Sequence, residues 1–332
     1  MQIYLKVINM TNPLSYILKS IRMISKKIHK YDWHDYSRIE YMGQQANDFI
    51  RKSIIESKDG LLIAKFGTIE LNSICCCKRR RAGLKKSDYI DYFRGKGTLF
   101  PKDALEYLYN NAGFFPKSLE LQEKFTDLVL NDIKDIDILG SYVDQETYLS
   151  SELMHCSKID IYGYCAPFAW VNPWTEVLKD KKVLIVHPFT ESIKNQYKNR
   201  EKLFNDTKVL PQFKELILIK AVQSIAGNGE KTGFKNWFDA LEYMENEVDK
   251  HDYDIALIGC GAYGMSLAAH CKRKGKIAIH MASWIQMLFG IYGQRWLIDQ
   301  PEFAHLINEY WVRPLESEKP ENVQKVENGA YW

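Results

Sequence analysis

The sequence DIALIGCGAYGMSLAA spans residues 254–269 and combines a short apolar run, three glycines and a second apolar segment. Gly259, Gly261 and Gly264 match the GxGxxG pattern, with an expected strand before it and an expected helix after it. In this pattern the first glycine permits a tight turn, the second lets the backbone approach a phosphate, and the third lets the helix pack on the strand. The helix N-terminus would offer free N–H groups and a partial positive charge to a diphosphate. The stretch therefore predicts one strand–helix unit of a Rossmann-like sheet, with either a phosphate site or a glycine-rich turn that only packs a helix.

The same alternation of strand and helix extends outward along the chain. Near-continuous apolar runs predict strands at 61–66, 136–140, 159–164, 182–187, 215–222, 254–260 and 276–281. Helical patterns lie at 47–57, from about 68, at 84–135 with breaks at 95–97 and near Pro101 and Pro116, and at 173–179, 192–204, 237–250 and 262–274. Strands separated by helices predict an α/β fold in which a parallel sheet carries helices on both faces.

The chain is expected to divide into three parts. A helical extension at 1–44 precedes a Rossmann-type domain at 45–313, which carries a helical insertion at about 84–135. The tail at 314–332 is charged and rich in turn-forming residues, but it ends in two aromatic residues. Aromatic side chains at a chain end predict that the tail docks back onto the domain.

The first thirty residues are basic and contain no Asp or Glu. After Pro13, which suits a first helical position, apolar residues repeat at helical spacing: Leu14, Ile17, Leu18, Ile21, Ile24 and Ile28. A basic amphipathic helix can lie on an anionic membrane surface, which would give a peripheral membrane contact through residues 14–30. The alternative is a helix that packs its apolar face on its own domain and leaves a solvated basic face, the more common arrangement.

The composition is that of an ordinary globular protein, with 332 residues, 46% hydrophobic and 26% charged. It excludes a disordered chain, a collagen and a disulfide-stapled miniprotein. A net charge of +3 gives no reason to expect a nucleic-acid partner. The seven cysteines show no zinc-ligand spacing, so reduced thiols in a cytoplasmic protein are expected. Neither a secretory signal nor an apolar run of membrane-spanning length is recognisable.

The first strand ends in a second informative stretch, KFGTIE at residues 65–70. Ligands of parallel α/β sheets bind beyond the carboxyl ends of strands, which places Glu70 where chemistry is usually done. Its carboxylate could ligate a phosphate-bound divalent cation or act as a general base. It could equally complement the dipole of the helix that it opens. The basic run KRRR at 78–81 is expected as solvated loop surface or as an attraction for phosphates or lipid headgroups.

Further polar residues end other expected strands. His187 ends the strand 182–187 and could hydrogen-bond a diphosphate, transfer protons, or be a half-buried structural histidine. His280 lies at the end of the strand 276–281, where a NAD enzyme would carry an acid that binds the ribose. Because that acid is missing, no NAD is expected, and a NAD(P)-dependent oxidoreductase stays an alternative that rests on GxGxxG alone.

Several more side chains have a functional and a structural interpretation. Gln196 and Arg200 lie four residues apart on an expected helix, as substrate contacts or as ordinary surface. Arg295 could pair with a diphosphate, and Trp296 could stack on a base or sugar or belong to the core. Tyr263 lies within the glycine motif, where an exposed ring would suit stacking and helix packing is the rival.

Several stretches in combination carry a family resemblance over roughly residues 45–332. They are FGxxE at 66–70, the glycine-rich turn, KVLIVHPF at 182–189, GKIAIH at 275–280, QMLFGIYGQRW at 286–296 and the terminal YW. With them the chain resembles bacterial glycosyltransferases of the GT-D fold, from capsule and O-antigen clusters that assemble surface polysaccharides. The resemblance implies a GT-D-type Rossmann-like fold. It also implies transfer of a sugar from a nucleotide-diphosphate-sugar donor to a glycan or lipid-linked acceptor.

The family pattern includes an Asp-x-Glu that binds a divalent metal. Its Glu corresponds to Glu70, and its Asp corresponds to Thr68, which is a poor ligand for Mg or Mn. The resemblance therefore implies either Mn or Mg bound at Glu70 by fewer protein groups, or a metal-free site that neutralises phosphate with Lys and Arg. Thr68 also leaves open a non-catalytic protein that binds a nucleotide sugar or a glycan.

The expected site residues fall into three sets. Glu70 and His187 are the expected catalytic residues. Contacts to the donor diphosphate are expected from Gly67, Thr68, Gly259, Gly261, Tyr263, Gly264, His280 and Arg295. Further substrate contacts are expected from Lys65, Gln196, Arg200, Gln286 and Trp296. The expected location is the cytoplasm, at the inner face of the cell membrane.

Overall fold

The structure is a computed structural model that describes residues 13–28 and 30–332. Seven strands form one sheet in the order β3-β2-β1-β7-β6-β4-β5, and every neighbouring pair is parallel. The strands are β1 (Leu61–Ala64), β2 (Ile138–Ser141), β3 (Ser157–Asp160), β4 (Lys182–His187), β5 (Glu215–Lys220), β6 (Ile255–Ile258) and β7 (Ile277–His280). The predicted α/β fold with a parallel Rossmann-like sheet is therefore confirmed.

Helices cover both faces of the sheet, and each face has its own apolar core. One core packs α3 (Thr68–Arg81), α5 (Pro101–Ala112), α6 (Leu119–Asp132), α10 (Trp237–Val248) and α11 (Gly264–Arg273) on the sheet. The other packs α2 (Gly43–Glu56), α7 (Ile161–Cys165), α8 (Thr190–Tyr197), α9 (Arg200–Leu203), α12 (Trp284–Leu288) and α13 (Arg295–Ile298). In β1, Leu62 and Ala64 join the first core, and Leu61 and Ile63 join the second. Burial on both faces explains why the strands are continuously apolar rather than alternating.

The helical segment between β1 and β2 breaks where the sequence predicts. The helix α4 (Lys86–Arg94) ends at Gly95, whose φ of 106° is a left-handed conformation that suits glycine. Pro101 is the first residue of α5, where its missing N–H costs no helical hydrogen bond. The side chain of Ser118 caps α6 by accepting a hydrogen bond from the Leu121 N–H.

Two predicted elements are wrong in detail. The strand expected at 159–164 ends at Asp160, because this side chain accepts a hydrogen bond from the Tyr162 N–H and caps α7. The helix expected at 192–204 is two helices, α8 and α9, with Lys198 and Asn199 between them. The 173–179 pattern forms a short 3₁₀ helix over Trp174–Leu178.

The basic run at 78–81 is not a solvated loop. It forms the last turn of α3, and its cations have partners within the chain. Lys78 pairs with Glu152 at 2.8 Å, and Arg79 is buried and donates to the carbonyl oxygen of Thr98 at 2.9 Å. Because these cations are paired within the chain, the run does not provide free charge for phosphates.

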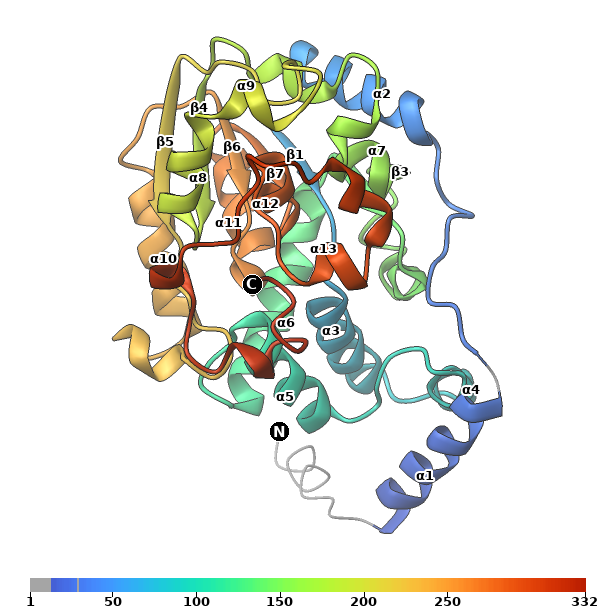
Figure 1. The fold of residues 1–332 in the computed structure, drawn as a ribbon. Coiled ribbons are helices and arrows are strands. Elements are labelled where there is room, and N and C mark those ends of the chain that lie inside the picture. Colours follow the sequence, from blue (N-terminus) through green and yellow to red (C-terminus); the bar gives the residue numbers. More distant parts are fainter. Residues whose placement is uncertain (1–12, 29) are drawn as a thin grey trace.

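The helix α1 (Pro13–Ile28) lies beside α4, at the lower right of Figure 1, away from the sheet. Its helical state is as predicted, but it does not turn its apolar face toward the domain. The exposed fractions of Ile17 and Ile28 are 55% and 69%. Among residues 13–28 and 30–332, no helix is long and apolar enough to cross a membrane.

The C-terminal tail returns to the middle of the molecule, and the end of the chain lies near α12 and α13 in Figure 1. The Ala330 carbonyl accepts a hydrogen bond from the Arg295 N–H at 2.7 Å. A side chain at Gly293 would overlap with the backbone of Tyr331. The tail therefore packs closely against the loop that precedes α13.

Candidate functional site

A pocket of about 180 Å³ lies at the carboxyl ends of the strands. The chain leaves neighbouring strands toward opposite faces of the sheet. After β1 and β6 it forms α3 and α11 on one face, and after β7 and β4 it forms α12 and α8 on the other. Such a reversal opens a crevice at the sheet edge, and ligands of open α/β sheets bind in it. The location of the pocket is the one that the strand-end argument predicts.

The pocket brings together most of the expected site residues from distant parts of the chain. Its wall includes Lys65, Gly67, Thr68, Glu70, His187, Gly259, Gly261, Tyr263, His280, Gln286 and Arg295. Gly264, Gln196, Arg200 and Trp296 do not line it.

Glu70 lies in the first turn of α3, with its carboxylate folded over Gly67. A Cβ atom at Gly67 would overlap with Oε2 of Glu70, so only glycine leaves room for this position. Burial raises the pKa of Glu70, and the nearby Lys65 opposes that shift. The arrangement presents a carboxyl group with a raised proton affinity at the pocket wall.

Two histidines of the pocket are buried and neutral. Burial lowers the pKa of His187 to about 3, and burial together with the charge of Lys65 lowers that of His280 to about 3. Nδ1 of His187 accepts a hydrogen bond from the Phe189 N–H at 3.0 Å, so the proton of the neutral ring resides on Nε2. His187 is therefore suited to donate a hydrogen bond from Nε2, and its acid–base role stays a prediction.

His280 and Gln286 carry polar atoms without partners among the described residues. Both ring nitrogens of His280 and Oε1 of Gln286 are buried and make no hydrogen bond of good geometry, although the backbone of Lys65 lies near the His280 ring. Buried polar groups are nearly always satisfied, so unpartnered ones at a pocket wall indicate where a ligand would bond. Gly264 leaves room for the His280 ring, because a side chain at Gly264 would overlap with it.

The glycines of the turn after β6 allow other segments of the chain to pack closely against this turn. A side chain at Gly259 would overlap with the Ala282 carbonyl. Gly261 has a φ of 60°, and a Cβ atom there would lie 2.9 Å from the carbonyl oxygen of Ala112 in α5. The turn continues into a 3₁₀ helix over Gly261–Tyr263 and then into α11. Its backbone lines the pocket beside the start of that helix.

Arg295 and Lys65 supply positive charge to the pocket. Arg295 pairs with Glu327 of the tail, and its guanidinium group lies 4.6 Å from the ring centre of Tyr331. Nζ of Lys65 donates a hydrogen bond to the Phe66 carbonyl at 3.1 Å and lies 5.5 Å from the ring centre of Tyr142. Both cations are thus held by their neighbours and oriented at the wall.

Several lining residues were not predicted from the sequence. They are Asn111, Tyr142, Gln223, Ser224, Ser283, Glu327, Tyr331 and Trp332. Gln223 and Ser224 lie three and four residues after the end of β5, so the strand-end rule that selected Glu70 could also have selected them. The terminal aromatic residues predict that the tail docks on the domain, but no local pattern places Glu327, Tyr331 and Trp332 at the pocket, because they reach it only through long-range packing.

The expected stacking role of Tyr263 is not available. Its side chain is 1% exposed, and its ring stacks on Trp237 with centroids 5.0 Å apart and planes at 3°. The hydroxyl group of Tyr263 lies 2.8 Å from Oγ of Ser224. Tyr263 therefore supports the pocket wall from within the core.

Three expected substrate contacts lie outside the pocket. Gln196 donates hydrogen bonds to the carbonyl oxygens of Gly290 and Tyr310, and so holds loops together. Arg200 belongs to the separate helix α9 and bonds Glu201 at 2.8 Å. Trp296 is fully buried against Trp284, as its structural interpretation predicted.

The pocket offers few protein ligands for a divalent metal. Within the part of the chain that the structure describes, no three His, Cys, Asp or Glu side chains come together as a metal site. At the end of β1 the oxygen ligands are the Glu70 carboxylate and the Thr68 hydroxyl, so a Mg²⁺ ion there would take most of its six oxygens from water and substrate phosphates. We therefore derive no chemical step through a metal.

Comparisons with known proteins leave the family open. The chain matches no protein-family model and none of the curated proteins. Among solved structures it is similar to a selenomethionine-substituted structure of domain of unknown function 1792. That similarity covers 91% of this chain and 96% of the other, at 12% sequence identity and a TM-score of 0.33. We base no functional argument on a likeness at this level.

Proposed function

We propose that this protein is a glycosyltransferase that moves a sugar from a nucleotide-diphosphate-sugar donor to a hydroxyl group of a glycan or lipid-linked acceptor. One observation carries the proposal: a carboxyl group, two cations and a glycine-rich turn meet in one pocket at the carboxyl ends of the strands. Cations and backbone N–H groups suit a diphosphate, and a carboxyl group suits the activation of a hydroxyl.

The donor diphosphate would lie between the glycine-rich turn and Arg295. The guanidinium group can form two parallel hydrogen bonds to phosphate oxygens, and the N–H groups at the start of α11 add partial positive charge. The unpartnered atoms of His280 and Gln286 would then bond donor oxygens or amide groups. This binding stabilises the charge that develops on the leaving diphosphate.

Glu70 would act as the general base. The acceptor oxygen attacks the anomeric carbon and forms the new C–O bond, while the bond from that carbon to the diphosphate oxygen breaks. The acceptor proton passes to Glu70, and the electron pair of the broken bond leaves with the diphosphate. A raised pKa suits this role, because a base works best when its pKa lies near the operating pH.

The leaving charge would be met by Arg295 and Lys65 rather than by a metal held by the protein. The basis is the ligand set at the end of β1, where Thr68 contributes a hydroxyl group instead of a second carboxylate. Adding EDTA should therefore lower turnover less than about tenfold, whereas a metal-dependent site would lose turnover almost completely.

Glu70→Gln tests the proposal. Nucleoside diphosphate release from UDP- and GDP-sugars, with and without sugar acceptors, should fall by about a hundredfold or more, the contribution of a general base. Glu56→Gln, at the exposed end of α2, is the matched control and should keep full turnover. Unchanged turnover in Glu70→Gln would remove this residue from the site.

The same pocket also fits a second candidate function, binding without catalysis. A single carboxyl group beside Thr68 also suits a protein that binds a nucleotide sugar without transferring it. Donor binding by calorimetry together with no release of nucleoside diphosphate, with any acceptor tried, would favour this second function.

A further inference from the structure

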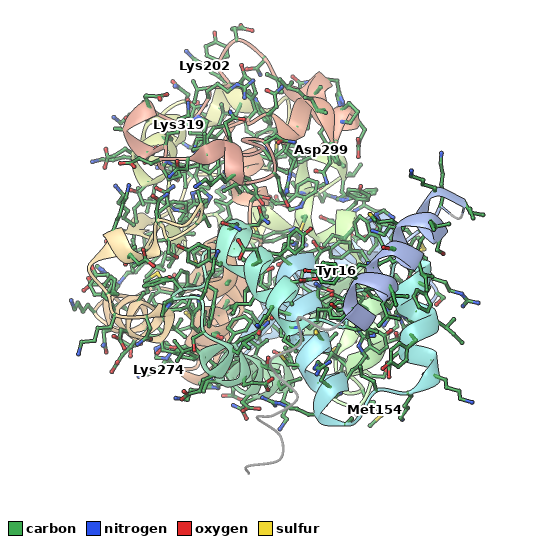
Figure 2. All side chains as sticks on the ribbon, turned by 90° about the horizontal axis from the view of Figure 1, so that it is seen from below. Tyr16, Met154, Lys202, Lys274, Asp299 and Lys319 are labelled. Carbon is green, nitrogen blue, oxygen red and sulfur yellow. The ribbon has the colours of Figure 1, made fainter. Side chains whose placement is uncertain are left out.

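The outward face of α1 is apolar, which reverses the usual arrangement of a surface helix. Ile17, Ile21, Ile24 and Ile28 follow one another at spacings of four, three and four residues, so they share one face of the helix. Their exposed fractions are 55%, 44%, 60% and 69%. We call this set the isoleucine stripe. Figure 2 shows α1 at the outer edge of the molecule, with Tyr16 labelled on it; the side chain of Tyr16 is 67% exposed.

The polar side of α1 is the one that attaches it to the domain. Arg22 donates hydrogen bonds to the carbonyl oxygens of Gly95, at 2.9 Å, and of Gly97. Its guanidinium carbon lies 4.3 Å from the ring centre of Tyr92. Lys19 pairs with Asp103 at 2.7 Å. These contacts hold the helix in the orientation that exposes the isoleucine stripe.

The charge around the isoleucine stripe is positive and unbalanced. Residues 1–31 contain no Asp or Glu, and Lys26 and Lys27 are exposed in the last turn of α1. The acids of the neighbouring segments are already paired: Asp103 bonds Lys19 of α1, Asp88 lies 3.6 Å from Arg79, and Asp91 accepts from the Tyr148 hydroxyl. Lys27 borders the isoleucine stripe, whereas Lys26 follows Arg22 by one turn on the side that faces Gly95. An anionic surface would therefore meet an exposed cation, Lys27, beside an apolar face.

We propose that α1 binds an anionic lipid surface, with the isoleucine stripe in the headgroup region and with Lys27 contacting lipid phosphates. An amphipathic helix of this kind lies in the plane of the interface, held by apolar burial and by attraction to anionic headgroups. A second copy of the chain is a poorer partner, because stripe-to-stripe packing would bring basic helix ends together with no acid between them.

Vesicle sedimentation of the full chain tests this proposal without any donor, so its result is separate from that of the transfer assay. The protein should pellet with vesicles of phosphatidylcholine and phosphatidylglycerol, and not with phosphatidylcholine alone. Ile24→Ser should weaken this binding by about tenfold, since it removes buried apolar area at the interface. Lys27→Glu should weaken it to a similar extent, and high salt should weaken it in the wild type.

Matched variants separate lipid binding from general effects. Ile55→Ser changes an isoleucine of α2 that is 62% exposed, against 60% for Ile24, and α2 lies at the opposite end of the molecule in Figure 1. Lys194→Glu changes an exposed lysine of α8. Both should bind vesicles as the wild type does. The proposal is overturned if the wild type does not bind, if only a chain lacking residues 1–12 binds, or if Ile24→Ser abolishes a dimer and leaves lipid binding unchanged.

Discussion

At the residue scale, Glu70 depends on the space that Gly67 leaves above its own Cα. The Glu70 carboxylate occupies the space that a Cβ atom would fill at position 67. Any residue other than glycine at that position would displace the carboxylate. A glycine at this position therefore acts on the chemistry through its neighbour, while contributing no functional group. The same relation holds between Gly264 and the unpartnered ring of His280.

Gly67→Ala should displace the Glu70 carboxylate and lower sugar transfer by at least about tenfold, because misplaced catalytic groups lose rate steeply. Overpacking of this kind costs about 1–3 kcal/mol of stability, so the variant should still fold. If the effect acts through Glu70, the double variant Gly67→Ala, Glu70→Gln should be no slower than Glu70→Gln alone. A further loss in the double variant would show an independent role for Gly67.

The buried histidines predict a pH dependence of stability. The folded-state pKa of His280 lies near 3, below the unfolded value of about 6.5, so between these values the unfolded chain binds more protons. Each such histidine therefore makes the free energy of unfolding rise with pH by about 1.4 kcal/mol per unit, and its contribution is lost as the pH falls below about 6.5.

His280→Gln should reduce that slope by about 1 kcal/mol per pH unit, measured by urea denaturation between about pH 5 and about pH 6.5, because the unfolded ring is only half protonated at the upper end of this range. His305→Gln, at an exposed position, serves as the control and should leave the slope of the wild type. Equal slopes in all three proteins would mean that His280 becomes protonated in the folded state as readily as in the unfolded chain.

At the element scale, the C-terminal tail forms part of the pocket wall and limits its size. A volume of about 180 Å³ is smaller than the roughly 300–1,000 Å³ of ordinary ligand pockets. Glu327 pairs with the guanidinium group of Arg295, to which a diphosphate would bind, and the ring of Tyr331 lies against the same group. We expect the tail to shift when a donor binds, with the diphosphate taking the place of the Glu327 carboxylate.

Glu327→Gln should therefore strengthen the binding of a nucleoside diphosphate, by a few-fold, about the strength of a partly exposed ion pair. Isothermal titration calorimetry with UDP and GDP gives the dissociation constants. Glu316→Gln is the control within the same tail, since Glu316 pairs with Lys319 on the surface. Equal or weaker binding by Glu327→Gln would show that this carboxylate does not compete with the ligand.

The sequence predicts the elements well where a local pattern determines them. Strand β6 and the turn after it follow from apolar residues and glycines that act within a few positions, and Glu70 follows from its place after β1. The end of β3 was missed because one side chain, Asp160, caps a helix inside an apolar run. The burial of Tyr263 against Trp237 and the tail residues at Arg295 depend on contacts between distant segments, for which a single sequence carries no signal.

At the scale of the whole molecule, two apolar cores hold the sheet between its helices, and the pocket rests on one of them. Trp237 is fully buried in the first core, in contact with Phe125, Phe114 and Tyr263. Because Tyr263 also lines the pocket, core packing and site geometry are coupled through this aromatic cluster.

Trp237→Ala should lower the free energy of unfolding by about 3–5 kcal/mol, the usual cost of removing a buried aromatic side chain. Trp33→Ala removes a side chain that is 40% exposed and should cost clearly less. Guanidinium denaturation measures both. A loss below about 1 kcal/mol for Trp237→Ala would contradict the packing described for the first core.

The central claim is that the pocket binds a nucleoside diphosphate through Arg295, and ligand-dependent thermal stability tests it most directly. A ligand that binds only the folded state raises the unfolding free energy by about 2.7 kcal/mol at a hundred times its dissociation constant. We predict that UDP, GDP or one of their sugar derivatives raises Tm of the wild type without added metal, while NAD does not. The rise should be lost in Arg295→Gln and retained in Arg313→Gln, an arginine that bonds the Trp332 carbonyl but does not line the pocket. No rise with any nucleotide, or the same rise in Arg295→Gln, would contradict the claim.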